Sequence, residues 1–368
     1  MKKFTLCLGS LLLFCVSMRA QNGLENVIVE TYYISDANDT MANADGGVLP
    51  IGSVTYRIYA DLLPGYKFQA GYGVPGHEVR FETSTLFFNN EDRGATTPTY
   101  TKVQSKANTV MLDSWLSVGA ACAGNFGIMK VYDDGAATNV NSFTPQVLQN
   151  ADTLAGIPIS VQDGIILITA RTPEPVTQVG IATEIEVFNN QNDGTNGPVF
   201  STSNGSWAAL NGAIGPDTVD NKVLIGQITT DGVFTFKLNI QIGTPTGGVQ
   251  NYVAENPVAN EIQIPSLIYP DTTGTSGIGN NTPDIPLFLV YPNPVKDLLT
   301  IKIIPSKQSN ENSYTIYDIN GRIVFHKNLG TSLDKYLDQV DMSSFAQGQY
   351  IIELVSNGVA SSKKFIKD

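Results

Sequence analysis

Histidine, the side chain that most often moves protons near neutral pH, is almost absent from this chain. The 368 residues include two histidines, His77 and His326. His77-Glu78 does not begin a zinc-hydrolase motif, because Phe81 stands where the second histidine is needed. The sequence also has no Gly-x-Ser-x-Gly nucleophile turn. These residues therefore predict neither a zinc hydrolase nor a serine hydrolase.

Two acids have a spacing that could serve glycoside hydrolysis. Glu184 and Glu186 lie two positions apart on a predicted strand, where they would share one face. A polysaccharide hydrolase needs two carboxyl groups about 5–10 Å apart across a cleft. Same-face acids also occur on any exposed strand. A secreted polysaccharide hydrolase with paired carboxylates is therefore the alternative to a non-enzymatic protein.

Hard oxygen donors gather between residues 36 and 45. The candidate ligands there are Asp36, Asn38, Asp39 and Asp45. Calcium prefers such ligands, although the spacing is not that of an EF-hand loop and no glutamate closes it. The sequence requires no cofactor and offers calcium as the one candidate, with a solvated turn as the alternative.

Aromatic side chains could form a platform for sugar rings. The candidates are Tyr56, Tyr59, Tyr66, Tyr72, Trp115 and Trp207. Tyr56 and Tyr59 are three residues apart, so they would lie on opposite faces of a strand and would not both belong to the core. Tyr66 and Tyr72 lie in glycine-rich segments and are expected to be exposed. Trp115 and Trp207 stand among small and apolar residues and are expected in the core.

These residues must be positioned by strands, because helical periodicity is almost absent. Apolar and polar residues alternate in short runs between turns such as Asp231-Gly232. The alternating segments of the body are residues 55–62, 79–83, 183–188, 222–228 and 233–240. The fold class is predicted to be all-β, with a large sandwich-like body over residues 21–270. An alternative divides this body into two packed halves that meet near residues 144–156.

The two ends of the chain differ from the body. Three residues with two lysines precede an apolar run and then Ala20, which predicts a secretory signal peptide over residues 1–20. A Gly-, Ser-, Thr- and Asn-rich stretch predicts a flexible linker over residues 271–286. Residues 21–285 carry 10 Lys and Arg against 26 Asp and Glu, a net charge of −16. This acidic body argues against binding to nucleic acid.

Residues 287–368 predict a small immunoglobulin-like sandwich of six or seven strands. Leu299, Ile301 and Ile303 alternate on one strand, and Asn320-Gly321 predicts a hairpin turn. The segment contains Tyr291-Pro-Asn-Pro and closes with Lys363-Lys-Phe-Ile-Lys.

These motifs, in this order, resemble the type A C-terminal sorting domain of the type IX secretion system. The residues that carry the resemblance are Pro292, Asn293, Pro294, Asn320, Gly321, Gly348, Tyr350, Lys363 and Lys364. The resemblance implies recognition by the type IX translocon and removal of the tail by its C-terminal signal peptidase. The cargo is then released outside the cell or attached to surface lipopolysaccharide.

Two further patterns concern the body. Bacteria with this secretion system attach O-glycans at Asp-Ser/Thr sites that are followed by an apolar residue or Thr, and the matching residues are Thr40, Thr153, Thr218 and Thr272. The segments around Trp115 and Trp207 resemble an uncharacterised extracellular β-domain of aquatic microbes, which implies no activity. The leading expectation is a secreted or surface-attached, non-enzymatic β-protein that binds extracellular glycans, adheres to cells or coats the surface.

Overall fold

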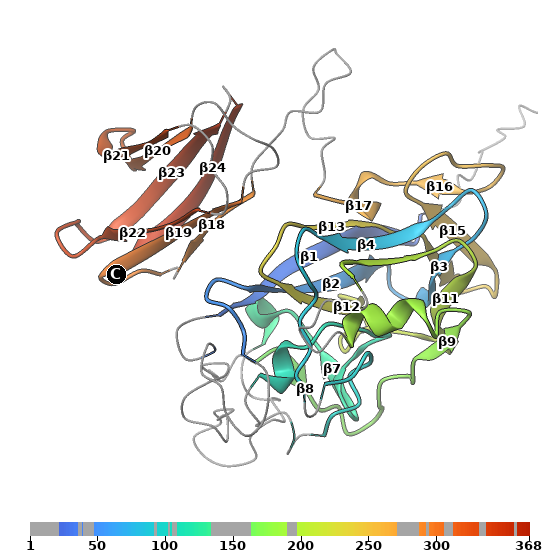
Figure 1. The fold of residues 1–368 in the computed structure, drawn as a ribbon. Coiled ribbons are helices and arrows are strands. Elements are labelled where there is room, and N and C mark those ends of the chain that lie inside the picture. Colours follow the sequence, from blue (N-terminus) through green and yellow to red (C-terminus); the bar gives the residue numbers. More distant parts are fainter. Residues whose placement is uncertain are drawn as a thin grey trace, which may run out of the picture.

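The fold is described by a computed structural model. It covers residues 22–35, 39, 48–91, 94–101, 104, 109–133, 163–189, 197–270, 287–291, 294–304, 312–330, 336–356 and 359–368. Within these ranges the chain is all-β and has no α-helix, which confirms the predicted fold class. The predicted signal peptide, the linker and the junction near residues 144–156 lie outside the described residues. Figure 1 shows the body and the C-terminal domain as separate groups of sheets.

A four-stranded sheet forms the middle layer of the body, in the order β1-β2-β12-β5. Its strands are β1 (Leu24–Ile34), β2 (Val54–Leu62), β12 (Lys222–Thr230) and β5 (Trp115–Leu116). β2 and β12 pair in antiparallel fashion and are buried along nearly their whole length. The middle sheet is therefore covered on both faces (Figure 1).

The second layer consists of a six-stranded sheet and a four-stranded sheet. The six-stranded sheet contains, in spatial order, β16 (Ile262–Gln263), β15 (Val249–Val253), β14 (Ile240–Gly243), β3 (Lys67–Gly73), β11 (Gly205–Ala213) and β9 (Thr177–Val179). The four-stranded sheet contains β10 (Val199–Thr202), β4 (Val79–Thr83), β13 (Phe234–Lys237) and β17 (Ile268–Tyr269). Each large sheet of the body thus combines strands from the beginning and the end of the body.

Aromatic rings fill the space between the first two layers. The Phe81 ring lies 5.8 Å from Phe200, 6.0 Å from Trp207 and 6.2 Å from Phe234, between ring centroids. Such ring pairs add about 0.5–1.5 kcal/mol each beyond the burial of their area. Trp207 Nε1 donates to the Ile225 carbonyl at 3.1 Å, so its one polar atom is paired. The predicted core position of Trp207 is confirmed.

A small lobe forms the third layer and covers the other face of the middle sheet. It contains β6 (Ala120–Cys122), β7 (Asn125–Gly127), β8 (Ile165–Ile166) and the 3-10 turns η3 (Val110–Leu112) and η4 (Lys130–Tyr132). Trp115 and Tyr59 pack in this second core, whereas Tyr56 packs in the first. The expectation that Tyr56 and Tyr59 cannot both be core is wrong, because the sheet has a core on each face.

The segment predicted as a strand over residues 183–188 is instead the 3-10 turn η5 (Glu184–Phe188). Ile185 and Phe188, three residues apart, both point into the core. The Phe188 ring stacks on Phe200 at 5.5 Å. A turn satisfies this spacing, whereas a strand would place the two side chains on opposite faces. One further turn, η6 (Pro265–Leu267), precedes β17.

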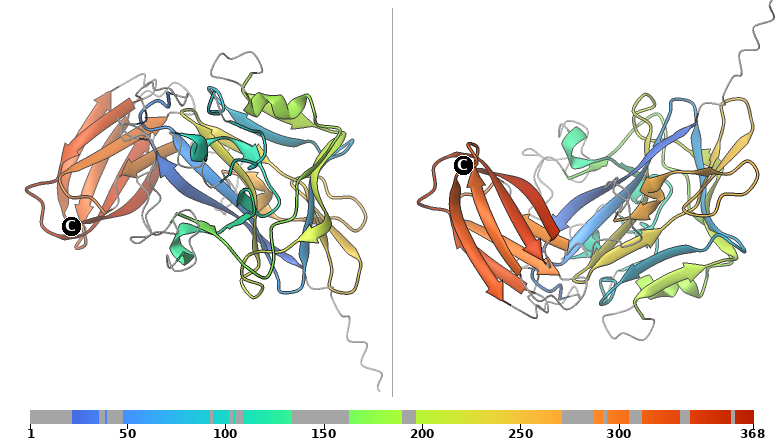
Figure 2. Two further views of the ribbon diagram at one scale, coloured as in Figure 1. Left: turned by 90° about the horizontal axis from the view of Figure 1, so that it is seen from below. Right: turned by 90° about the horizontal axis from the view of Figure 1, so that it is seen from above.

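The C-terminal domain consists of two antiparallel sheets packed face to face (Figure 2). One sheet contains β18 (Leu287–Tyr291), β19 (Leu298–Ile304) and β22 (Tyr336–Asp341), and the other contains β21 (Ile323–Gly330), β20 (Asn312–Asp318), β23 (Gly348–Ser356) and β24 (Val359–Lys367). The predicted inward residues Leu299, Ile301 and Ile303 are buried. Gly321 has a φ of +76° in the predicted hairpin turn. An immunoglobulin-like topology stays a prediction.

The C-terminal domain touches the body through a lysine. Lys302 on β19 is 1% exposed, although it alternates with the core residues of its strand. Its Nζ donates to the Gly52 carbonyl at the turn before β2. Lys302 therefore faces away from its own core and is covered by the body.

Gly71 tests the packing of the six-stranded sheet. A Cβ at this position would lie 2.2 Å from the Trp207 ring. We expect Gly71→Ala to lower the free energy of unfolding by about 1–3 kcal/mol, because a fully buried indole cannot move aside. Chemical denaturation of the purified protein measures the effect. Gly248→Ala is the control, since its Cβ meets the Thr244 hydroxyl at 3.3 Å, and equal stability of both variants would contradict this packing.

Candidate functional site

Arg57 is the centre of a polar network buried between the middle sheet and the lobe. Its Nε donates to Gln227 Oε1 and its Nη1 donates to the Gly164 carbonyl, both at 2.9 Å. Its guanidinium carbon lies 3.6 Å from the centroid of the Tyr32 ring, a cation–π contact. Gln227 Nε2 in turn donates to the Asp113 carbonyl at 2.8 Å. The network thus joins the sheet to the lobe.

Glu30 provides a negative charge beside Arg57. Burial raises the pKa of Glu30, although the positive charges of Arg57 and Lys130 oppose the shift. Glu30 Oε1 accepts a hydrogen bond from the Lys130 backbone N–H at 2.7 Å, and Oε2 accepts one from the Tyr59 hydroxyl at 3.3 Å. Because protein groups contact both carboxylate oxygens, we assign this network to the stability of the fold.

Asp113 is a second buried acid at the edge of the lobe. Its Oδ1 accepts a hydrogen bond from the Asn90 backbone N–H at 2.7 Å, whereas its Oδ2 has no partner among the described residues. Burial raises the pKa of Asp113 well above its usual range, against the effect of backbone hydrogen bonds from Asn90 and Ala95. A carboxyl group buried in this way is a source of pH-dependent stability.

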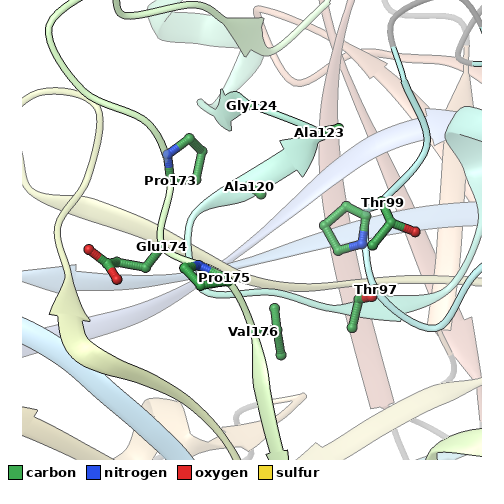
Figure 3. A pocket seen from close by; sticks show the side chains of 10 residues that line it. Thr97, Thr99, Ala120, Ala123, Gly124, Pro173, Glu174, Pro175 and Val176 are labelled. Carbon is green, nitrogen blue, oxygen red and sulfur yellow. The ribbon is translucent and has the colours of Figure 1, made fainter.

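A cavity of about 400 Å³ lies between the lobe and the extended segment of residues 173–176. Figure 3 shows the side chains that line it. Its walls are mainly proline, alanine and threonine, and Glu174 is the one charged residue that lines it. Glu174 Oε2 accepts a hydrogen bond from Asn211 Nδ2 at 3.2 Å. The cavity therefore has no set of convergent polar groups that would orient a ligand.

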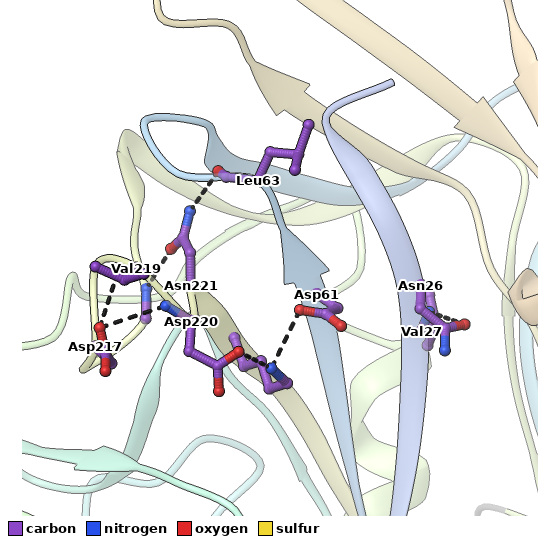
Figure 4. A network of polar contacts seen from close by, with 10 residues as sticks. Asn26, Val27, Asp61, Leu63, Asp217, Val219, Asp220 and Asn221 are labelled. Atoms are coloured by element: carbon purple, nitrogen blue, oxygen red, sulfur yellow. Dashed lines mark hydrogen bonds and ion pairs between the residues drawn. The ribbon is translucent and has the colours of Figure 1, made fainter. Parts of the chain in front are cut away.

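Figure 4 shows a group of acids around a lysine near the start of β12. Lys222 Nζ lies 3.5 Å from Asp61 Oδ1 and also pairs with Asp220 Oδ1. Backbone N–H groups of Val219 and Asp220 donate to Asp217 and lower its pKa. Lys222 pairs with two of these carboxylates and would repel a metal ion, so we assign this group to the structure of the surface before β12.

The outer face of the six-stranded sheet carries a group of hydrogen-bonding side chains around a pocket. The Tyr72 face, as we name it, surrounds a pocket of about 380 Å³ lined by Ala70, Tyr72, Val74, Ser206, Gln241, Asn251 and Glu261. These residues come from β3, the turn after it, β11, β14, β15 and the segment before β16. The sheet register places Ser206 opposite Tyr72, and places Gln241 between Ala70 and Asn251.

A buried asparagine fixes the position of Tyr72. Asn239 Nδ2 donates to the carbonyls of Tyr72 and His77 at 3.1 Å and of Glu78 at 3.2 Å. Asn239 Oδ1 accepts a hydrogen bond from the Ala254 backbone N–H at 3.2 Å. Because one side chain holds both ends of the turn after β3, Tyr72 is presented on a rigid element.

Glu261 is the one acid that lines the pocket. His77 Nε2 lies 3.0 Å from Glu261 Oε2, and the Val258 backbone N–H donates to the same oxygen at 2.8 Å. Burial, and then the nearby charge of Glu261, raises the pKa of Tyr72 to about 12, so this hydroxyl stays protonated at neutral pH. The pocket therefore offers a neutral phenol, two amides, a hydroxyl and one carboxylate, a set suited to hydrogen bonding.

None of the described residues among the other predicted sites lines this pocket. Asp39 is buried, and its Oδ2 accepts a hydrogen bond from the Tyr33 hydroxyl at 2.7 Å. The other three calcium candidates, Asp36, Asn38 and Asp45, lie outside the described residues, so calcium stays a prediction. No group of three or more His, Cys, Asp or Glu suited to a metal occurs in the described ranges.

Thr218 is exposed in the loop before β12, as a glycan attachment site would require. Thr40, Thr153 and Thr272 lie outside the described residues, and attachment stays a prediction at all four positions. Glu184 and Glu186 lie on η5, so the strand geometry that would have aligned them is absent.

Among the described residues, the sorting-signal positions lie on the surface of the C-terminal domain with one exception. Pro294, Asn320, Gly321, Gly348, Lys363 and Lys364 are exposed. Tyr350 is buried, and its ring stacks on Phe365 at 5.5 Å. Pro292 and Asn293 lie outside the described residues.

Sequence reasoning found Tyr72 but missed its partners. Gln241 lies between the buried residues Ile240 and Ile242, and this alternation indicates a polar residue on an outer face. Nothing in the sequence placed Asn251, Ser206 or Glu261 beside it, because they come from strands and loops that are distant in the chain.

Comparison with known proteins identifies the C-terminal domain. Residues 289–368 match the secretion system C-terminal sorting domain family. This segment is a type IX secretion sorting domain, and it directs export to the cell surface or the extracellular space. No curated protein matches the chain. No helix in the described part of the chain is long and apolar enough to cross a membrane.

Two solved structures share limited similarity with the chain. Dimeric latent PorU from Porphyromonas gingivalis is 16% identical with a TM-score of 0.22, over 41% of this chain and 14% of that one. The CARDB domain of a Pyrococcus furiosus protein, in complex with di-metal ions, is 13% identical with a TM-score of 0.17, over 26% of this chain and 100% of that domain.

Arg57 tests the buried network. We expect Arg57→Met to lower the free energy of unfolding by about 2–4 kcal/mol, because the acceptors on Gln227 and Gly164 and the charge of Glu30 lose their partner. Thermal and denaturant unfolding of the purified protein measure the effect. Arg80→Met is the control, because Arg80 pairs with Glu82 at the surface, and we expect it to cost less than about 1 kcal/mol. Similar losses in both variants would contradict the role given to Arg57.

Asp113 tests the pH dependence of stability. Because the pKa of Asp113 is raised in the folded protein, the unfolded chain loses this proton at a lower pH, near the ordinary aspartate pKa of about 4. The free energy of unfolding therefore falls as pH rises from there through the folded pKa. We expect Asp113→Asn to remove this part of the slope in denaturation curves measured from pH 4 to pH 8. Parallel curves for the variant and the wild type would rule this out.

Proposed function

We propose that the protein is a non-enzymatic binding protein that acts at the cell surface or outside the cell. The Tyr72 face carries this proposal, since it presents an aromatic ring, two amides and a hydroxyl on a rigid sheet. Ligand sites commonly combine a concave surface with a few fixed polar groups of this kind. The sorting domain provides the route to the location where such a surface would meet ligands.

In the proposed export route, the C-terminal domain is a sorting signal that is cleaved from the body. Its exposed residues, which include Lys363 and Lys364, would be recognised by the type IX translocon. The C-terminal signal peptidase would then separate it from the body. Release of the body, or its attachment to lipopolysaccharide, follows from the same family resemblance.

We rank the hydrolase alternative second to binding. Glu186 is exposed and Glu184 half-buried on a surface turn. Their Cα atoms belong to η5, where residues two apart point in different directions. Glu261 in the Tyr72 face is fixed by His77, with no second acid in the pocket lining. General acid–base cleavage of a glycoside needs two carboxyl groups, so this pocket supports binding rather than hydrolysis.

The export route can be tested in the native cell. We expect deletion of residues 287–368 to leave the body in the periplasm, because the sorting signal is lost. The full-length chain should reach the surface or the medium. Immunoblots of cell fractions measure the distribution, and equal export of both forms would refute the assigned route.

The role of the body is tested with the exported protein. We expect it to adhere to cells or to insoluble extracellular matrix and to release no reducing sugar from a polysaccharide panel. Hydrolysis without any measurable adhesion would overturn the proposal in favour of an enzyme.

A further inference from the structure

We propose that the Tyr72 face is a binding subsite for neutral hexopyranose units of an extracellular polysaccharide. This inference rests on the proposed binding function and specifies its ligand. It follows from three properties of the pocket: the surroundings of the aromatic ring, the geometry of the amide pair, and the sign of the charge.

The aromatic ring stands among short side chains. Ser206 lies directly across from Tyr72 in the register, and Ala70 pairs with Ala208 in the next row. Tyr72 is half-buried, and no hydrogen bond from its hydroxyl to a described residue is present. A ring flanked by alanine and serine offers its face to a flat apolar partner. The C–H face of a pyranose ring is such a partner, and its hydroxyls would then reach the sheet.

The two amides form a matched pair beside the ring. Gln241 Nε2 donates to Asn251 Oδ1 at 3.0 Å, on adjacent strands at paired positions. This contact uses one donor and one acceptor, whichever way the two amides are turned. One amide oxygen and one NH₂ group therefore remain for a ligand. Neighbouring hydroxyls of a sugar each donate and accept, so they can satisfy both groups at once.

The charge of the pocket excludes acidic sugars. Neither lysine nor arginine lines it, and Glu261 contributes a carboxylate. The surrounding segment of residues 21–285 has a net charge of −16. A uronic acid or a sulfated sugar would meet repulsion at the site and across the body. Both protein contacts of Glu261 use Oε2, so Oε1 can accept a hydrogen bond from a sugar hydroxyl.

The size of the pocket limits how much ligand it holds. Its volume of about 380 Å³ lies near the lower end of the range of about 300–1,000 Å³ for ligand sites. The pocket therefore fits one or two sugar units of a longer chain. Binding at a single subsite of this kind is weak, and the test must detect weak interactions.

Affinity gel electrophoresis of the purified full-length protein tests the inference. The neutral probes are soluble mannan, dextran and a mixed-linkage β-glucan, and the acidic probe is alginate. We expect retardation by at least one neutral probe and none by alginate. Tyr72→Ala should weaken binding to that probe at least tenfold, and Tyr72→Phe should stay within threefold of the wild type, because the ring is kept.

Two further variants keep the test independent of folding. Gln241→Ala with Asn251→Ala removes the amide pair on the outer face and should weaken binding at least fivefold. Leu210→Ala is the control on the same sheet, since Leu210 is 79% exposed on β11 and lies outside the pocket lining. Thermal unfolding of every variant checks that the fold is intact.

Each outcome decides between the two levels of the proposal. Unchanged binding by well-folded Tyr72→Ala, or preference for alginate, would overturn the subsite. Adhesion to cells with no retardation by any neutral probe would overturn the subsite and leave the proposed function standing. Absence of both adhesion and retardation would remove the proposed function as well.

Discussion

The buried guanidinium of Arg57 is the centre of the polar network that joins the layers of the body. Arg57 lies in the middle sheet, and its hydrogen bonds and ring contact reach both β12 and the lobe. Removing such a group would leave several buried polar atoms without partners, which costs more free energy than its presence contributes. The three-layer arrangement depends on this network, because the lobe offers only short strands with few backbone hydrogen bonds of their own.

The same arrangement creates the exposed face on the opposite side of the molecule. The middle sheet has a core on each face, so its polar side chains are buried and out of reach of a ligand. The six-stranded sheet has a core on one face only, where Trp207 and Tyr252 pack. Its other face keeps unpaired hydrogen-bonding groups around Tyr72. The division between an inner sheet covered on both faces and an outer sheet open on one face separates structural polar groups from those available to a ligand.

Prediction from the sequence succeeded where local pattern decides the structure. The strands around residues 55–62 and 222–228, the hairpin at Asn320-Gly321 and the sorting domain follow from alternation, turn chemistry and ordered motifs. It failed where tertiary packing decides. Alternation cannot show that Thr55, Arg57 and Gln227 face a second core rather than water, and it cannot distinguish a strand from a turn at Glu184.

The candidate site was predictable only in part, for a related reason. Tyr72 stands in a glycine-rich segment that indicated exposure. Its partners on β11, β14 and β15 are up to 179 positions away in the chain, and only the sheet register brings them to its side. No single-sequence pattern carries that information.

The interleaved sheets also determine when the body can fold. The Leu24 and Val27 backbone N–H groups donate to the side chains of Tyr252 and Ser266, 228 and 239 positions later in the chain. A chain that emerges from a membrane channel with its beginning first must therefore keep its first strand unpaired at these points until the last strands of the body have crossed. Pairing over such separations is slow. The sorting domain follows all of these strands in the chain. It can therefore be recognised only after every strand that the body needs to complete its sheets has already crossed.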